Sequence, residues 1–124
     1  MANFLDPEFA DDMGLVAMGG DLSPGRLIEA YRAGIYPWFE EGGPIFWWSP
    51  DPRAIFEMDG LHVSRRLTRT LRSGRFRCTA DQAFDRVLHG CADRDEGTWI
   101  TADMIAAYRR LHRLGLALRR QRLR

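Results

Sequence analysis

Large aromatic side chains crowd into residues 34–53 (GIYPWFEEGGPIFWWSPDPR), which makes this stretch the best suited to recognition chemistry. Three of the four tryptophans of the chain lie here, Trp38, Trp47 and Trp48. A flat indole can stack on a nucleic-acid base, a contact that contributes about 1–3 kcal/mol per base and reads no sequence. Aromatic side chains also commonly fill a small hydrophobic core. The sequence therefore leaves two uses open for these residues, a stacking surface and a core.

Four prolines divide the same stretch, at positions 37, 44, 50 and 52. Proline fixes its own φ and biases the preceding residue toward an extended conformation. We therefore predict a stiff, extended segment rather than a helix. Trp47 and Trp48 are adjacent, so on an extended strand they point to opposite faces, and at least one of them is expected to be structural.

The charge is distributed unevenly along the chain. Residues 1–60 contain three arginines and eleven acidic residues, and residues 61–124 contain fifteen arginines and six acidic residues, giving −8 and +9. Such asymmetry suggests that the second part meets a polyanion. Every fixed positive charge is a guanidinium, because the sequence has no lysine. Phosphate recognition and GC-rich codon usage both account for that choice.

A short helix is predicted after Ser64, which is placed as its N-cap, and Gly74 marks its end. Leu67 and Leu71 share one side of this helix. The other side carries four arginines without an acidic partner, Arg65, Arg66, Arg69 and Arg72. Like charges at this spacing repel each other, so an anion bound along the face would explain the arrangement. Phosphate binding and a solvated surface remain the two interpretations.

The other elements that must position these residues follow from caps and periodicity. The sequence predicts strands at 14–18, 53–58 and 75–79, with Ile55 and Phe56 of the second contributing to packing. It predicts a helix between Ser23 and Gly34, another at 81–91, and a last one between Thr101 and Gly115. The last of these carries an apolar face that includes Met104, Tyr108 and Leu111.

Composition narrows the class of protein. With 124 residues, 45% of them hydrophobic, the chain has room for one domain, or for a small domain and part of another. No apolar run approaches the roughly 20 residues that span a bilayer, and the first residues do not resemble a signal peptide. Cys78 and Cys91 lie 13 apart without a nearby histidine cluster, which argues against a zinc site and fits reduced thiols in a cytoplasmic protein.

Several motifs follow one another along the chain: GLVAMGGDLSPG (14–25), YRAGIYPWF (31–39), PIFWWSPDPR (44–53), LHVSR (61–65), GCADRDEGTWIT (90–101) and AYRRLHRLG (107–115). Strings such as WWSPDPR and EGTWIT are far more specific than a short glycine motif. Taken in order, these motifs resemble the bacterial leucyl/phenylalanyl-tRNA–protein transferases. The similarity covers about residues 4–115.

The resemblance implies an enzyme that moves Leu or Phe from leucyl-tRNA or phenylalanyl-tRNA to a protein whose N-terminal residue is Arg or Lys. This modification marks the acceptor for degradation in the N-degron pathway. It implies no metal and no organic cofactor, no membrane partner, and a monomer in the full-length family. The tryptophans of the PWF and GTW motifs, Trp38 and Trp99, would line the pocket of the 3′-terminal aminoacyl-adenosine. Phosphates of the tRNA would meet the four arginines after Ser64.

The resemblance also implies the architecture, an α+β fold. Residues 1–59 would form a small amino-terminal domain with short antiparallel strands, and residues 60–115 would begin an acetyltransferase-like (GNAT-like) domain whose sheet is incomplete. Family members run to nearly twice this length, so the catalytic groups are expected in the carboxy-terminal half. Residues 116–124 are interpreted as an aberrant arginine-rich tail, explained by a pseudogene product, a sequencing frameshift or a genuine truncation. Apolar helix faces near Leu67, Phe84 and Leu111 would then lack their cover. The alternative function is a non-catalytic RNA-binding fragment.

Overall fold

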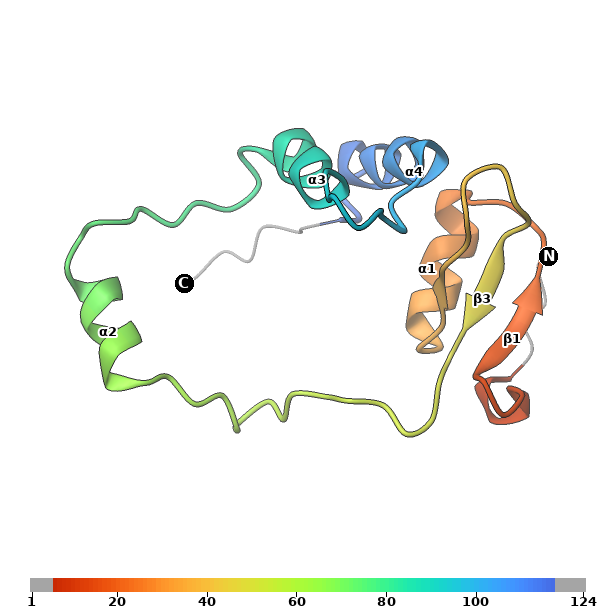
Figure 1. Cartoon of the computed structure of the whole chain (residues 1–124), viewed down its shortest axis with the longest axis horizontal. Helices are drawn as coiled ribbons and strands as arrows, with labels where there is room; N and C mark the ends of the chain where they lie inside the picture. The colour runs from red at the N-terminus through yellow and green to blue at the C-terminus, as the bar shows by residue number, and fades with distance from the viewer. Residues whose placement is uncertain (1–5, 118–124) are drawn as a thin grey trace.

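The computed structural model describes residues 6–117, which form an α+β fold with a small antiparallel sheet and four α-helices (Figure 1). The elements are the 3₁₀ turn η1 (Pro7–Phe9), the strands β1 (Leu15–Met18), β2 (Tyr36–Pro37) and β3 (Phe46–Trp48), and the helices α1 (Pro24–Arg32), α2 (Arg65–Arg72), α3 (Phe84–Ala92) and α4 (Ala102–Arg113). Most of the predicted tail at 116–124 lies outside the described residues.

The sheet has the order β1-β3-β2, with both pairs antiparallel. Trp48 pairs with Leu15 on one side and with Tyr36 on the other, so β3 is the central strand. A register shift in β1 follows Leu15. Trp47 is fully buried, whereas Trp48 is partly exposed to solvent. The prediction that at least one of them is structural is therefore confirmed.

Helix α1 begins and ends where the sequence predicts. The Ser23 hydroxyl accepts a hydrogen bond from the amide of Arg26, and Gly34 follows the helix with φ +75°, the left-handed conformation of a helix-ending glycine. The helix packs on the sheet through Leu27 and Ala30. The main cluster of buried residues contains Val16, Leu27, Ala30, Ile35, Trp47 and Leu111.

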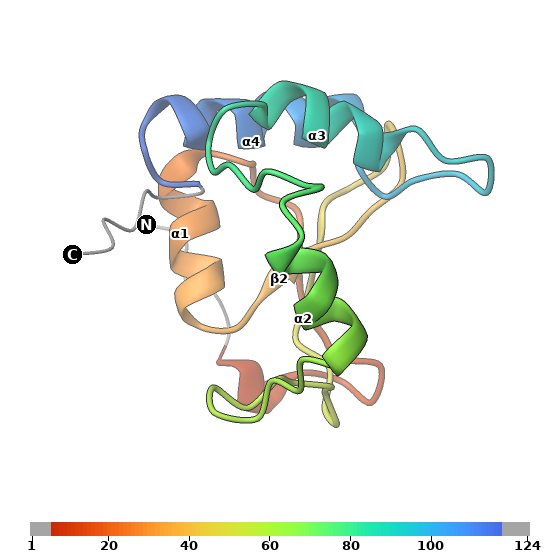
Figure 2. The ribbon, with the colours of Figure 1, turned by 90° about the vertical axis from the view of Figure 1, so that its left-hand side faces the viewer.

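Leu111 joins this core from helix α4, which lies against α1 (Figure 2). Its side chain is only 3% exposed. The prediction that the apolar face near Leu111 lacks a cover is therefore wrong, because Leu111 is buried in the core cluster where α4 lies against α1. Thr101 caps α4, and Gly115 follows it with φ +71°, as predicted.

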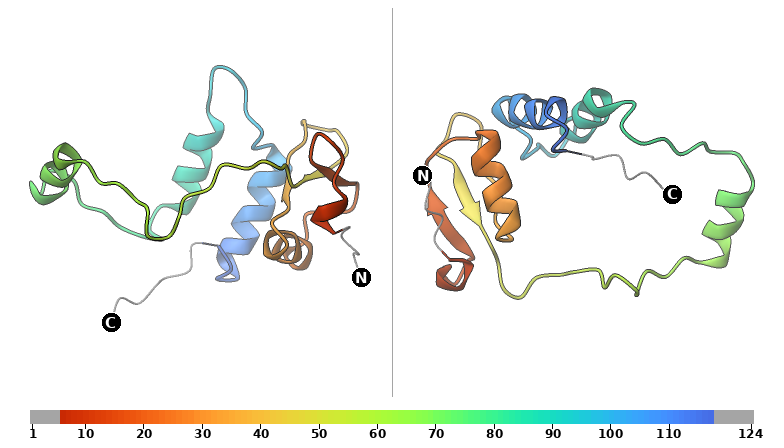
Figure 3. Two further views of the ribbon diagram at one scale, coloured as in Figure 1. Left: turned by 90° about the horizontal axis from the view of Figure 1, so that it is seen from below. Right: turned by 180° about the vertical axis from the view of Figure 1, so that it is seen from behind.

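Helix α2 stands away from the rest of the protein between two long connections (Figures 1 and 3). Ser64 caps it as predicted, accepting a hydrogen bond from the amide of Leu67 at 3.1 Å. The predicted strands at 53–58 and 75–79 are wrong, since a strand needs a hydrogen-bonded neighbour and neither segment has one among the described residues. Ile55 and Phe56 are 72% and 90% exposed, so their predicted packing is also wrong.

Helix α3 lies beside α4 and begins at Phe84, three residues later than predicted. Asp81 cannot start the helix, because its φ of +62° lies in the left-handed region. Its carboxylate instead contacts the imidazole of His112 on α4, and that ring stacks on Phe84 with centroids 4.2 Å apart. The ion pair between Arg109 and Asp85, 2.9 Å, adds a second link between the two helices.

Candidate nucleic-acid interface

Trp38 is presented on a rigid piece of backbone directly after β2. Its amide donates to the carbonyl of Phe46 at 3.0 Å, and its own carbonyl accepts a hydrogen bond from the Trp48 indole at 2.8 Å. These two contacts fix the peptide units on both sides of the Trp38 Cα. The indole of Trp38 is nevertheless 52% exposed. A large flat ring on a fixed backbone, half in solvent, has the form of a stacking platform.

Trp99 approaches from the connection between α3 and α4. It lies two residues before the cap Thr101, whose amide donates to the Trp99 carbonyl at 3.1 Å. The two indoles stack on each other with centroids 5.4 Å apart and an angle of 17° between their planes. The structure therefore brings together two tryptophans that are 61 residues apart in the sequence. Because the rings are already stacked, a further flat ring would fit on the exposed side of Trp38 rather than between them.

An apolar pocket of about 190 Å³ opens beside this pair, between α3 and α4. It is lined by Phe84, Val87, Leu88, Cys91, Trp99, Ile100, Met104 and Tyr108. The Tyr108 hydroxyl forms a hydrogen bond with the hydroxyl of Tyr31 on α1. Burial raises the pKa of both tyrosines above the ordinary value, so both hydroxyls are neutral at physiological pH.

The predicted arginine face is present on α2, and all four of its guanidinium groups belong to exposed residues. Arg65, Arg69 and Arg72 line one open hollow of about 600 Å³ together with Val63, Thr68 and Ser73. Arg66 is not among the residues that line it. Within residues 6–117, no carboxylate forms an ion pair with any of the four. The structure does not bring this face to the stacked tryptophans, since α2 stands apart (Figure 3).

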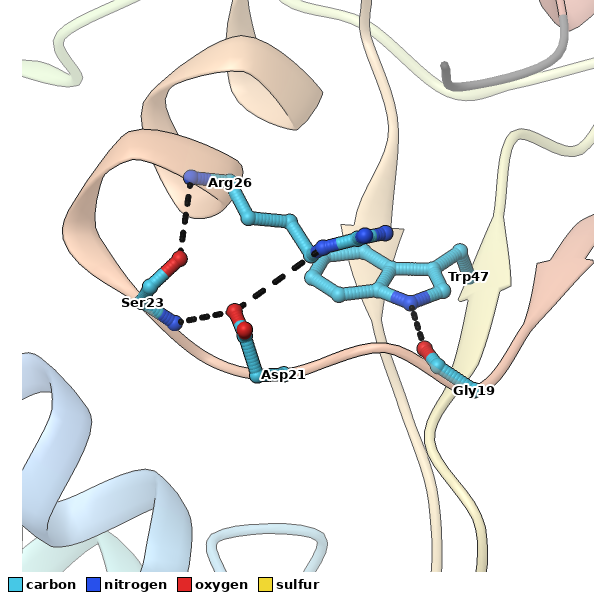
Figure 4. Close-up of polar contacts among 5 residues, drawn as sticks. All are labelled: Gly19, Asp21, Ser23, Arg26 and Trp47. Carbon is cyan, nitrogen blue, oxygen red and sulfur yellow. Dashed lines mark hydrogen bonds and ion pairs between the residues drawn. The ribbon is translucent and has the colours of Figure 1, made fainter. Parts of the chain in front are cut away.

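A polar cluster around Trp47 ties the start of α1 to the central strand (Figure 4). The Trp47 indole donates to the Gly19 carbonyl at 2.9 Å, and the Arg26 guanidinium lies over the ring, 6.0 Å from its centroid. Asp21 lies 3.9 Å from Arg26, and hydrogen bonds from Ser23 hold the pKa of its carboxyl below the usual value. This cluster explains why Trp47 serves the core and not a binding surface.

Sequence reasoning missed one contact beside the tryptophan pair. A carboxylate oxygen of Glu41, in the turn between β2 and β3, accepts a hydrogen bond from the amide of Ala102 at 3.0 Å. The two residues are 61 positions apart, so no local pattern indicates the contact. Among residues 6–117, no group of three or more His, Cys, Asp or Glu side chains is arranged to hold a metal ion. The helices described are all too short or too polar to cross a membrane.

Comparison with known proteins gives the family. The model of the leucyl/phenylalanyl-tRNA protein transferase family matches residues 55–120, and the model of the N-terminal domain of the same family matches residues 20–51. The chain belongs to the leucyl/phenylalanyl-tRNA–protein transferase family. The family recognition made from the sequence motifs is therefore confirmed.

Curated members of this transferase family are closely similar to the chain. The leucyl/phenylalanyl-tRNA–protein transferase of Anaeromyxobacter dehalogenans (strain 2CP-C) is 58% identical over 118 residues, covering 92% of this chain and 51% of the relative. Those of Citrobacter koseri and Escherichia coli O1:K1 / APEC are 56% and 53% identical, each over 92% of this chain and 50% of the relative. The chain spans about half the length of the curated relatives it matches.

Proposed function

We propose that this chain supplies the tRNA-end-binding part of an aminoacyltransferase that moves Leu or Phe from aminoacyl-tRNA to an acceptor protein. The observation that carries the proposal is the stack of Trp38 on Trp99, in a chain of the transferase family. The terminal adenine of tRNA would stack on the exposed side of Trp38. Because stacking reads no sequence, one platform serves both leucyl-tRNA and phenylalanyl-tRNA.

The proposed reaction is an acyl transfer. The α-amino nitrogen of the acceptor's N-terminal Arg or Lys attacks the ester carbonyl carbon of the aminoacyl-tRNA, forming a C–N bond. The ester C–O bond to the terminal ribose then breaks, and the proton lost by the amine goes to the ribose oxygen. No oxidant or reductant takes part. Such a step needs a group to manage the proton and donors for the developing oxyanion, which we assign to the half of the family's length that this chain does not span.

The arginine face of α2 would hold the tRNA by its phosphates. Phosphate contacts position a nucleic acid without specifying its sequence, which suits an enzyme that accepts two different tRNAs. The open hollow between Arg65, Arg69 and Arg72 supports this role, since several guanidinium groups converge there without a carboxylate partner among the described residues. Arg66 would contribute charge from the flank of the helix.

The proposed architecture divides the chain at about residue 59. Residues 1–59 would be a small amino-terminal domain, and residues 60–115 would begin a GNAT-like domain completed by the rest of the family's length. The exposed side chains of Leu67 and Leu71, 48% and 55%, support an apolar surface that awaits such a cover. We propose a cytoplasmic protein that uses no metal or organic cofactor and acts as a monomer in its full-length form.

The decisive experiment measures binding and transfer separately. Binding of radiolabelled leucyl-tRNA to the chain is measured by filter retention, with a Trp38→Ala, Trp99→Ala double variant for comparison. Transfer is measured as label incorporated into a peptide with N-terminal Arg, against the same peptide with an acetylated N-terminus. The expected result is binding by the chain that depends on the tryptophans. A full-length relative assayed beside it should transfer the label only to the free N-terminus, and this transfer should depend on the two equivalent tryptophans.

The same experiment separates the alternative function, a non-catalytic RNA-binding fragment. Coverage of only about half of each curated relative favours this alternative for the chain acting alone. Tryptophan-dependent binding by the chain, with transfer in the full-length relative that does not depend on the equivalent tryptophans, would assign the chain to it. Equal retention of leucyl-tRNA by the parent and the double variant would refute the stacking proposal.

A further inference from the structure

The contact between Glu41 and Ala102 is placed where it can govern the tryptophan pair. Glu41 follows Trp38 by three residues, and Ala102 follows Trp99 by three residues. Each tryptophan is therefore joined by a short stretch of main chain to one partner of the same hydrogen bond. Trp38 is fixed to the sheet through Phe46 and Trp48, and Trp99 is fixed to the start of α4 through Thr101.

The Ala102 amide is one of the groups that a helix cannot satisfy by itself. The first four amides of an α-helix have no acceptor in the preceding turn. In α4, Thr101 accepts from Met104 at 3.2 Å, and Glu41 accepts from Ala102 at 3.0 Å. A carboxylate is favoured at this end of a helix because the helix dipole is positive there. The Ala102 amide therefore needs an acceptor from outside α4, and the Glu41 carboxylate supplies it.

Packing contacts between α4 and the amino-terminal layer lie further along the helix. Ala107 and Tyr108 pack against the core and Leu111 enters it, five, six and nine residues after Ala102. At 1.5 Å per residue these contacts lie about 8–14 Å from the start of α4. The hydrogen bond from Ala102 to Glu41 adds a contact at the first turn itself, close to Trp99.

We propose that Glu41 is a positioning residue that keeps the indole of Trp38 in register with that of Trp99. The hydrogen bond to Ala102 fixes the turn after Trp38 on the first turn of α4, and the two rings then meet face to face. The consequence for binding, a preformed platform for the terminal adenosine, rests on the proposed function. The dependence of the tryptophan stack on Glu41 does not require any ligand.

The test compares Glu41→Ala and Glu41→Gln with Glu40→Ala in the full chain. Glu40 is the adjacent exposed glutamate, and its removal changes the net charge in the same way as Glu41→Ala. The first readout is the exciton couplet that two stacked indoles give in the circular-dichroism spectrum. It is assigned by its loss in Trp99→Phe. The second is affinity for 3′-leucylamido-3′-deoxyadenosine, measured by titration calorimetry. Ellipticity at 222 nm reports the folded fraction of every variant.

Glu41→Ala is expected to lose most of the couplet while keeping its helical ellipticity, and to bind the adenosine analogue about 2- to 10-fold more weakly. Glu41→Gln is expected to retain most of the couplet, because its amide oxygen still accepts from Ala102. Glu40→Ala should match the parent in both readouts. A mere surface contact would leave the couplet unchanged.

An undiminished couplet in Glu41→Ala, or a parent spectrum without the couplet, overturns the inference whatever the nucleotide result. Equal loss in Glu40→Ala also overturns it, since charge alone would then be the cause. If Glu41→Ala does not fold, Ala102→Pro decides, because proline is tolerated at the first helical position but has no amide to donate: a lost couplet supports the hydrogen bond and an undiminished couplet overturns the inference. A couplet that depends on Glu41 in a parent that does not bind the analogue supports the positioning role and refutes the proposed function.

Discussion

Trp38 and Trp47 offer a direct contrast between a proposed platform and a core residue in one protein. Trp38 is 52% exposed and Trp47 is fully buried, although only eight residues lie between them. Trp47→Ala should cost about 3–5 kcal/mol of unfolding free energy, the range for a buried tryptophan. Trp38→Ala removes about half as much buried surface, so we expect a loss of roughly 1.5–2.5 kcal/mol.

Affinity should follow the opposite order. Loss of the stacking ring in Trp38→Ala should weaken binding of an aminoacyl-adenosine analogue by about 1–3 kcal/mol, which is roughly 5- to 150-fold. Trp47→Ala should weaken apparent binding only as far as it lowers the folded fraction. Trp38→Phe, which keeps a smaller aromatic face, should lie between Trp38→Ala and the parent.

Urea denaturation and titration calorimetry on the same preparations measure both quantities. The affinity of each variant is corrected for the fraction folded at the assay temperature. If Trp38→Ala is as destabilising as Trp47→Ala and its corrected affinity equals that of the parent, the platform interpretation is refuted. Trp38 would then be an exposed member of the core and nothing more.

Four further outcomes are expected. Replacing Arg65, Arg69 and Arg72 of α2 together should make the plot of log tRNA affinity against log salt concentration shallower by about 2–3, at roughly 0.7–0.9 for each lost phosphate contact. An unchanged slope would assign these arginines to solvent. Burial raises the pKa of Tyr108, so the stability that its neutral hydroxyl contributes is present below about pH 10. Above that pH this contribution is lost, by up to about 1.4 kcal/mol of unfolding free energy per pH unit. The urea midpoint should therefore fall less steeply with rising pH in Tyr108→Phe than in Tyr36→Phe. Gly14→Ala should destabilise the fold by more than about 1 kcal/mol, because the φ of Gly14 is +88° and the new Cβ would lie 2.6 Å from Pro50 Cα. Gly25→Ala should instead stabilise α1 by about 0.5–1 kcal/mol in the same denaturation assay. The exposed apolar side chains should make the isolated chain aggregate or unfold at modest temperature, so a cooperative monomeric transition above about 60 °C in calorimetry would contradict that expectation.

The helix ends could be predicted because their causes are local. Ser23, Ser64 and Thr101 each accept a hydrogen bond from an amide three residues later, and a glycine with positive φ follows each of these helices. A cap and its partner are neighbours in sequence, so the pattern can be read directly. The start of α3 cannot be predicted in this way, because Ala83 precedes it without a side-chain cap.

Strands and the site depend on distant partners, which periodicity does not reveal. Residues 53–58 have an extended-looking composition but no strand beside them among the described residues, so no strand forms. The meeting of Trp38 with Trp99 was expected only from the family resemblance, because nothing local links the two. The cover of Leu111 and the contact of Glu41 with Ala102 required the tertiary structure itself.

The position of Leu111 in the core means that this core is completed only late in synthesis of the chain. The sheet and α1 are made first, yet their core is closed by a side chain 64 residues after Trp47. At about 5–20 residues per second, a ribosome needs roughly 3–13 s to add those residues. During that interval the amino-terminal layer lacks the core residue that α4 supplies. A nascent chain that stops before α4 should therefore be less stable than one that includes it.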